Sequence, residues 1–269
     1  MRIYIYNFTK RLTYAIINHR EFICSGGGND MKKAVGLALC AGLLAGAFGA
    51  ADVSAHGVFV ANSLDQRVLV LGEGPGNNVY DPACVQMVEG YDKNFQPTAV
   101  DVVRHGDHIS FANTENLGVT TTFFDYGYFT KTKDGKTVNA PFSEVPNAVK
   151  TTHAVKYNVN YWDPEVKPGY IYNVPIQIVP SVNPLTLRKG DTFEIRAYKD
   201  GKLMADAPLI KDVINDLTNE SKTDAHGRAT VTVAANGLNV IGIEIAYPTD
   251  DPNTQVKYFS SLSFIIEPE

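Results

Sequence analysis

His56 has the clearest capacity for metal chemistry in this sequence, because a cleavage signal stands directly before it. Val53-Ser54-Ala55 places small residues at the positions that a signal peptidase reads. Cleavage after Ala55 would make His56 the first residue and give it a free α-amine beside its imidazole. These two nitrogens can chelate nickel, copper, cobalt or zinc. The alternative interpretation is a frayed first residue that binds nothing.

Four further histidines follow in the chain, and most of them lie in turn-like sequence. His105 and His108 flank Gly106-Asp107, which is typical of a turn between two strands, so we expect a polar hairpin tip rather than a metal site. His226 lies in a second turn of the pattern Asp-x-x-Gly. No turn signal accounts for His153, which is either a metal ligand or an ordinary surface or packed histidine.

The sequence carries no motif of a familiar enzyme class. It has no nucleophile elbow, no phosphate-binding glycine loop, no paired zinc cysteines and no His-Glu-x-x-His helix. The aromatic run at residues 123–129 indicates sheet packing, although its tyrosine hydroxyls could also line a polar pocket. We therefore predict a binding protein, not an enzyme.

The first 55 residues have the organisation of an export leader. A cationic start at Met31-Lys32-Lys33 precedes an apolar run at residues 34–50, so residues 31–55 are predicted to be a signal peptide. Residues 1–30 are interpreted as an upstream extension from a misplaced start, or else as a long cationic region of the same signal. Lipidation at Cys40 is the alternative processing route. Localisation in the periplasm is the expectation.

The charge balance excludes one class of partner. The 269-residue chain has a net charge of −5, and removing the leader takes away six basic and three acidic residues, which leaves −8. An acidic protein lacks the cations that neutralise phosphates, so no nucleic-acid partner is expected. After cleavage, no segment is long and apolar enough to span a membrane.

Short strands rich in β-branched and aromatic residues predict an all-β fold. A segment with two prolines and a glycine at residues 163–169 separates two groups of strands, so we expect two β-sandwich domains, at 56–165 and 170–269, the second immunoglobulin- or transthyretin-like. Residues 143–161 show no clean period and are expected to form a loop with a helical turn. The expected strands cover residues 58–61, 67–71, 85–88, 99–103, 108–112 and 119–124, then 171–179, 192–198, 229–233, 240–247 and 257–266.

The chain also resembles a known family along nearly all of its mature length. The segments that carry the resemblance include Ala55-His56-Gly57-Val58, Gly72-Glu73-Gly74, Val79-Tyr80-Asp81-Pro82-Ala83, Gly127-Tyr128-Phe129-Thr130-Lys131-Thr132, His153 with Lys156-Tyr157, Pro175-Ile176-Gln177-Ile178-Val179-Pro180, and Gly237-Leu238-Asn239-Val240-Ile241. They resemble periplasmic proteins of a domain-of-unknown-function family, identified as the periplasmic component of nickel or cobalt uptake systems of the ABC or energy-coupling type. The resemblance implies that His56 and His153 are metal ligands, with Glu73 as a third candidate.

Four functions follow as hypotheses from these observations. The first is a periplasmic protein that captures Ni(II) or Co(II) for the permease components of a membrane uptake transporter. The second is a copper-binding protein, because affinity order alone favours Cu(II) over nickel. The third is a copper oxygenase, which needs a second histidine beside His56. The fourth is a structural envelope protein that binds no metal.

Overall fold

The computed structural model describes residues 56–267, and these form strands joined by turns and single 3₁₀ turns. No α-helix occurs within this range, so the all-β prediction is confirmed. The segments predicted to be a signal peptide and an upstream extension lie outside the described residues. No helix in the described part of the chain has the length and hydropathy needed to cross a membrane.

A nine-stranded sheet forms the centre of the molecule. Its strands follow the order β14-β13-β16-β17-β9-β7-β3-β4, with β8 paired to β7. Their bounds are β3 Val85–Tyr91, β4 Pro97–Thr98, β7 Val119–Thr132, β8 Thr137–Val138, β9 Ala148–Tyr161, β13 Pro208–Asp212, β14 Asp216–Lys222, β16 Gly237–Pro248 and β17 Thr254–Ile266. The neighbours in this sheet are antiparallel except β9 and β17, which run parallel.

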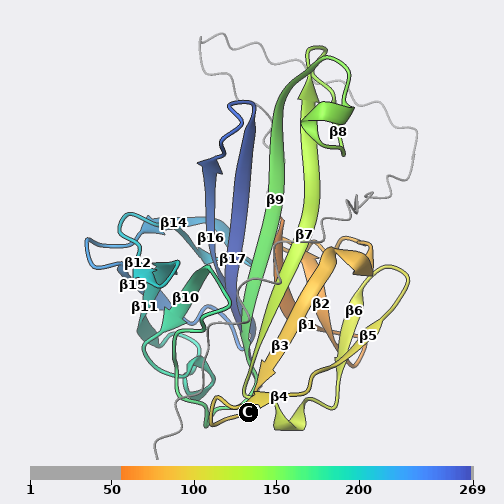
Figure 1. Ribbon diagram of the computed structural model, residues 1–269. Coiled ribbons are helices and arrows are strands. Elements are labelled where there is room, and N and C mark those ends of the chain that lie inside the picture. The colour runs from red at the N-terminus through yellow and green to blue at the C-terminus, as the bar shows by residue number, and fades with distance from the viewer. Residues whose placement is uncertain (1–55, 268–269) are drawn as a thin grey trace, which may run out of the picture.

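Two four-stranded sheets flank the long strands of the central sheet (Figure 1). The first has the order β1-β2-β6-β5, with β1 Gly57–Ser63, β2 Gln66–Gly72, β5 Asp101–Arg104 and β6 Ile109–Ala112. The second contains β10 Ile176–Pro180, β11 Thr192–Lys199, β12 Lys202–Leu203 and β15 Arg228–Thr232. The 3₁₀ turns are η1 Pro82–Cys84, η2 Thr114–Asn116, η3 Phe142–Glu144 and η4 Pro184–Thr186.

Each small sheet presents its edge strand to strand β17. The Ser261 hydroxyl donates to the carbonyl oxygen of Val58 in β1, and the Ser260 hydroxyl donates to the carbonyl oxygen of Ile176 in β10. Successive residues of a strand point to opposite faces, so the two small sheets lie on opposite faces of the central sheet. Buried serines thus satisfy main-chain groups that an edge strand would otherwise leave unpaired.

Three apolar clusters hold these layers together. The largest packs Leu262 and Phe264 of the central sheet against the β10–β11 side, where Ile176, Ile178 and Ile195 are fully buried. The other two lie on either face of β1, and they include Val58 with Phe124 and Phe59 with Phe259. Strand β1 is therefore buried on both faces, which fixes the position of its first residues.

The structure corrects one sequence prediction and extends others. Residues 148–161, expected as loop with a helical turn, form β9 in the middle of the central sheet. Strands β13 and β14 were not anticipated, and β7 continues past residue 124 to Thr132. The division into two β-sandwiches stays a prediction, although strands from both sides of residues 163–170 pair within one sheet.

Candidate functional site

His56 and Glu73 lie at the open end of the β1–β2 hairpin. The antiparallel register pairs Gly57 with Gly72 as the last residues of the two strands. His56 immediately precedes this pair and Glu73 immediately follows it, so the two residues come together where the hairpin opens. A nitrogen ligand and a carboxylate ligand are thereby brought to one place by residues 17 positions apart.

Packing against the central sheet fixes the backbone at His56. A Cβ atom at residue 57 would lie 2.5 Å from the ring of Phe259, so the glycine allows the start of β1 to approach this ring closely. Strand β1 runs in the same direction as β17, because Val58 meets Ser261 and the Val60 amide donates to the Ser263 hydroxyl. His56, which directly precedes β1, therefore lies beside the part of β17 that precedes Ser261.

The loop that follows β2 holds Glu73 by main-chain hydrogen bonds. The amide of Gly74 donates to the carbonyl oxygen of Val213 at 2.9 Å, and the amide of Gly76 donates to the carbonyl oxygen of Glu73 at 2.9 Å. Leu71 and Asn78 close the loop with an isolated bridge. These contacts tie the residue to the central sheet as well as to its own hairpin.

Charged side chains of the central sheet, one of them buried, lie within electrostatic reach of Glu73 at this hairpin end. Lys156 of β9 is 2% exposed, and its ammonium group lies 5.3 Å from the centre of the Tyr126 ring. The pKa of Lys156 is lowered to about 7, chiefly by burial and also by the charge of Lys257, whereas the carboxylates of Glu244 and Glu73 act in the opposite direction. Lys257 forms an ion pair with Glu244. The site therefore combines two lysines, two glutamates and His56.

His153 lies on the other face of the central sheet. It is three residues from Lys156 along β9, whose pairing with β17 is uninterrupted between them, so the two side chains point in opposite directions. The His153 imidazole Nε2 lies 2.8 Å from the Asp125 carboxylate, and its ring stacks on Tyr128 at 4.3 Å between centroids. The structure thus brings His56 and Glu73 together and leaves His153 apart from them.

The turn predictions for the other histidines are confirmed. His105 and His108 join β5 to β6, where the His105 amide donates to the carbonyl oxygen of His108 and the two rings stack at 4.3 Å. The His105 ring bonds Ser110, and the His108 ring bonds Asp107. His226 lies in the turn before β15, where its amide donates to Asp224.

Sequence reasoning did not identify the lysines and Glu244 that surround the hairpin end. Lys156 lies in one of the segments that carry the family resemblance. Its burial could not be predicted, because residues 143–161 were expected to form a loop. Alternation of Val155, Tyr157 and Val159 was the available signal for a strand that buries Lys156. Within residues 56–267, no three histidine, cysteine or acidic side chains converge as a metal-binding group. His56 and Glu73 are the sequence-predicted side-chain donors at this end of the hairpin.

An all-β protein with a central sheet between two smaller sheets is the class that the described residues define. The chain belongs to the family described as Domain of unknown function (DUF4198), whose model matches residues 79–246, more than half of the chain. This confirms the family part of the resemblance, and the nickel or cobalt association stays a prediction. Comparison with curated proteins and with solved structures gave no match.

Proposed function

We propose that this protein is a periplasmic binding protein that captures Ni(II) or Co(II) for a membrane uptake transporter. The observation that carries the proposal is the position of His56 beside Glu73 at the end of the β1–β2 hairpin. In this proposal the protein is not an enzyme, and the metal ion is its cargo. The permease components of the transporter are its partners in the membrane.

The donor set suits the proposed cargo. Signal cleavage after Ala55 would add the α-amine of His56 to its imidazole and to the Glu73 carboxylate, which gives two nitrogens and an oxygen. Imidazole and amine nitrogens favour borderline divalent ions over calcium or magnesium. The negative charge of the mature chain favours encounter with cations, in a salt-dependent way.

A metal titration of protein that begins at His56 tests the proposal. We expect His56→Ala and Glu73→Gln each to weaken Ni(II) and Co(II) binding by about tenfold or more, because loss even of a hydrogen-bonding partner of a ligand costs about 10–100-fold. One extra residue before His56 should weaken binding at least as much, because it removes the free amine. Affinity should also fall from pH 8 to pH 6, because nitrogen ligands must lose their protons to bind.

His153→Ala is the matched control for this titration. The sequence resemblance implied that His153 is a ligand, but its position on the opposite face of β9 leads us to expect an unchanged affinity. An N-terminal extension that leaves the affinity unchanged would refute the amine chelate. If His153→Ala weakens binding as strongly as His56→Ala, the ligand set is the one implied by the resemblance instead.

Copper is the second candidate cargo, since the same donors bind Cu(II) more tightly than Ni(II) in the general affinity order. Parallel titrations with Cu(II) on the same variants separate the two ions by affinity. A copper oxygenase receives less support, because the histidine brace needs a second imidazole near His56. His153, which the resemblance implies as a metal ligand, projects from the face of β9 opposite to Lys156.

A further inference from the structure

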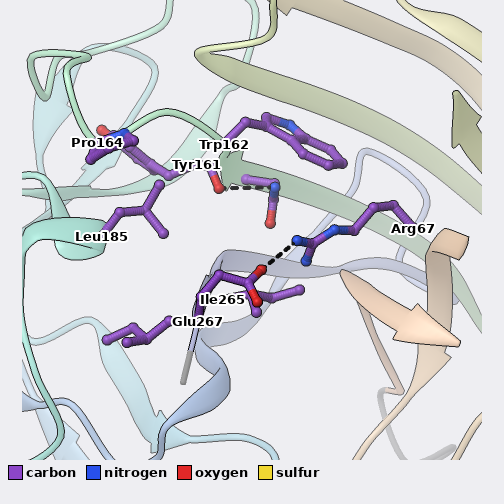
Figure 2. A pocket seen from close by; sticks show the side chains of 9 residues that line it. Arg67, Tyr161, Trp162, Pro164, Leu185, Ile265 and Glu267 are labelled. Carbon is purple, nitrogen blue, oxygen red and sulfur yellow. Dashed lines mark hydrogen bonds and ion pairs between the residues drawn. The ribbon is translucent and has the colours of Figure 1, made fainter. Parts of the chain in front are cut away.

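A cavity lies at the opposite end of the β1–β2 hairpin from His56 and Glu73. Its volume is about 270 Å³, and the nine residues that line it come from the start of β2, the end of β9 with residues 162 and 164, turn η4, and the end of β17. Figure 2 shows Arg67 entering from one side, with Pro164 and Leu185 on the other side. The two halves of the chain thus meet around one partly open cavity, and such junctions are frequent positions for ligand sites.

The apolar wall of this cavity is fixed in place. The indole N–H of Trp162 donates to the Thr120 hydroxyl at 2.8 Å, and the indole ring packs edge-on against Phe111 at 5.5 Å between centroids. Leu185 and Ile265 contribute aliphatic surface to the same space. A held indole facing aliphatic groups offers a preformed surface for a flat or branched apolar group.

One cation and one anion stand among the nine lining residues. The guanidinium Nη2 of Arg67 lies 2.8 Å from the Glu267 carboxylate, which follows the last residue of β17. The Arg67 side chain is 29% exposed and that of Glu267 is 68% exposed. An ion pair as exposed as this one is weak, so another carboxylate can replace Glu267 at little cost. Glu267 shows where such a carboxylate would bind.

We propose that this cavity binds a small organic monocarboxylate whose apolar body packs against Trp162. In the bound state, the carboxylate of the ligand takes the place of Glu267 on the Arg67 guanidinium, whose planar fork matches a carboxylate in geometry. The volume lies just below the usual range of about 300–1,000 Å³ for ligand pockets, so the ligand is small. The site is separate from the proposed metal site and does not depend on it.

A groove next to the cavity explains why the proposed ligand carries a single negative charge. It shares Arg67, Trp162 and Pro164 with the cavity, and it is also lined by Lys93, Glu115, Asp163 and Glu165. Lys93 is paired with Glu165 at 2.5 Å. The remaining acidic groups, Glu115 and Asp163, repel a dianion more strongly than a monoanion. Phosphate esters and dicarboxylates are therefore disfavoured relative to monocarboxylates.

The protein contains its own reporter for this site, because Trp162 is the one tryptophan of the chain. We use phenylacetate as the probe and follow tryptophan emission together with the thermal midpoint. The expected result is a saturable change in emission and a rise in the midpoint. Phenylacetamide, which has the same shape without the charge, should bind at least tenfold more weakly.

Three variants assign the effect to the ion pair. Arg67→Gln should weaken phenylacetate binding at least tenfold, and Glu267→Gln should strengthen it a few-fold by removing the competing carboxylate. Arg196→Gln is the matched control, because Arg196 is an exposed arginine paired with Glu194 on β11, outside the cavity. It should leave binding unchanged.

Three results would overturn the proposal. The first is the absence of both an emission change and a midpoint shift at about 10 mM phenylacetate, a concentration that saturates a site of millimolar affinity. The second is equal binding of phenylacetate and phenylacetamide, and the third is unchanged binding in Glu267→Gln. Because Glu267→Gln alters an exposed residue after the last strand, it tests the ion pair even if Arg67→Gln fails to fold.

Discussion

Lys156 is the buried group that most distinguishes this protein at the scale of single residues. Its side chain lies under the start of β1, over the ring of Tyr126, and in the field of Glu244, Lys257 and Glu73. Taking an ammonium group out of water costs several kcal/mol unless close partners compensate. The lowered pKa of Lys156 shows that compensation here is incomplete.

Replacing Lys156 with methionine should therefore stabilise the protein at and below neutral pH. The pKa falls from 10.5 in the unfolded chain to about 7 in the folded one, so between these values the unfolded chain binds more protons and stability rises with pH. Below pH 7 both states are charged, and the full cost of burial remains. Lys156→Met should then be more stable than the parent by a few kcal/mol, on the order given by about 1.4 kcal/mol per pKa unit.

Urea unfolding at pH 6.5 and pH 9.5 measures this difference. The advantage of Lys156→Met should shrink at the higher pH, because the parent loses its penalty as Lys156 becomes neutral. Lys202→Met, at an exposed position on β12, is the control and should show no such pH dependence. An advantage that grows with pH would contradict the assigned direction of the pKa shift.

The sequence proposes members for the candidate site but not their geometry. His56 followed from the cleavage signal, and Glu73 followed from the resemblance, but their juxtaposition depends on the hairpin register, which a two-residue turn sets. His153 could not be excluded from the sequence, because the face on which a strand residue lies depends on recognising the strand. To predict a contact between residues far apart in sequence, one must know which strands pair and in which register. No local sequence pattern contains that information.

At the scale of elements, the turn of the β1–β2 hairpin has a strained backbone. Ser63 pairs with Gln66, so the turn consists of Leu64 at φ 48° and Asp65 at φ 63°. Such two-residue turns need positive φ at both positions, where Asn-Gly is the preferred pair and a leucine is disfavoured. Leu64 is 96% exposed, so its side chain contributes no burial in return.

Replacing both residues, Leu64→Asn with Asp65→Gly, should raise the free energy of unfolding by about 1–2 kcal/mol. The turn between β11 and β12 gives the precedent, because it uses Asp200 and Gly201 with positive φ at both positions. Leu64→Ala is the control, since alanine keeps the cost of positive φ and should change stability little. Equilibrium urea unfolding provides the measurement, and a double variant no more stable than Leu64→Ala would contradict the assignment of strain.

Strand β9 shows why part of the fold escaped prediction. Asn158 and Asn160 are buried, and Asn158 donates to the hydroxyls of both Ser261 and Ser263 at 2.9 Å. The face of β9 that carries these asparagines is turned toward the edge of β1 and is both buried and polar. Recognition of a strand from a period of two expects a buried face to be apolar. Strands with ordinary alternation, such as β11, were predicted directly from the sequence.

At the scale of the whole molecule, the pairing of β9 with β17 joins the two halves of the chain. Ten consecutive register pairs link Thr151–Asn160 to Thr254–Ser263 in parallel. The largest apolar cluster also takes residues from both halves, among them Val159 and Tyr161 from the first and Ile176 and Leu262 from the second. Two of the three apolar clusters therefore depend on residues from both halves.

We therefore expect residues 56–269 to unfold in one cooperative transition, and the separate segments 56–165 and 170–269 to lack cooperative unfolding. Without β17, strand β9 loses one of its two neighbours, and without β9, strand β17 becomes the exposed edge of a smaller sheet. Far-UV circular dichroism and the emission of Trp162, at the end of β9, should give coincident urea transitions for the whole chain, which is the test for two-state behaviour. Mixing the two segments should restore structure, because the ladder between β9 and β17 can re-form between chains. If each segment instead unfolds cooperatively with its own midpoint, the halves are independent domains and the shared sheet contributes little to their stability.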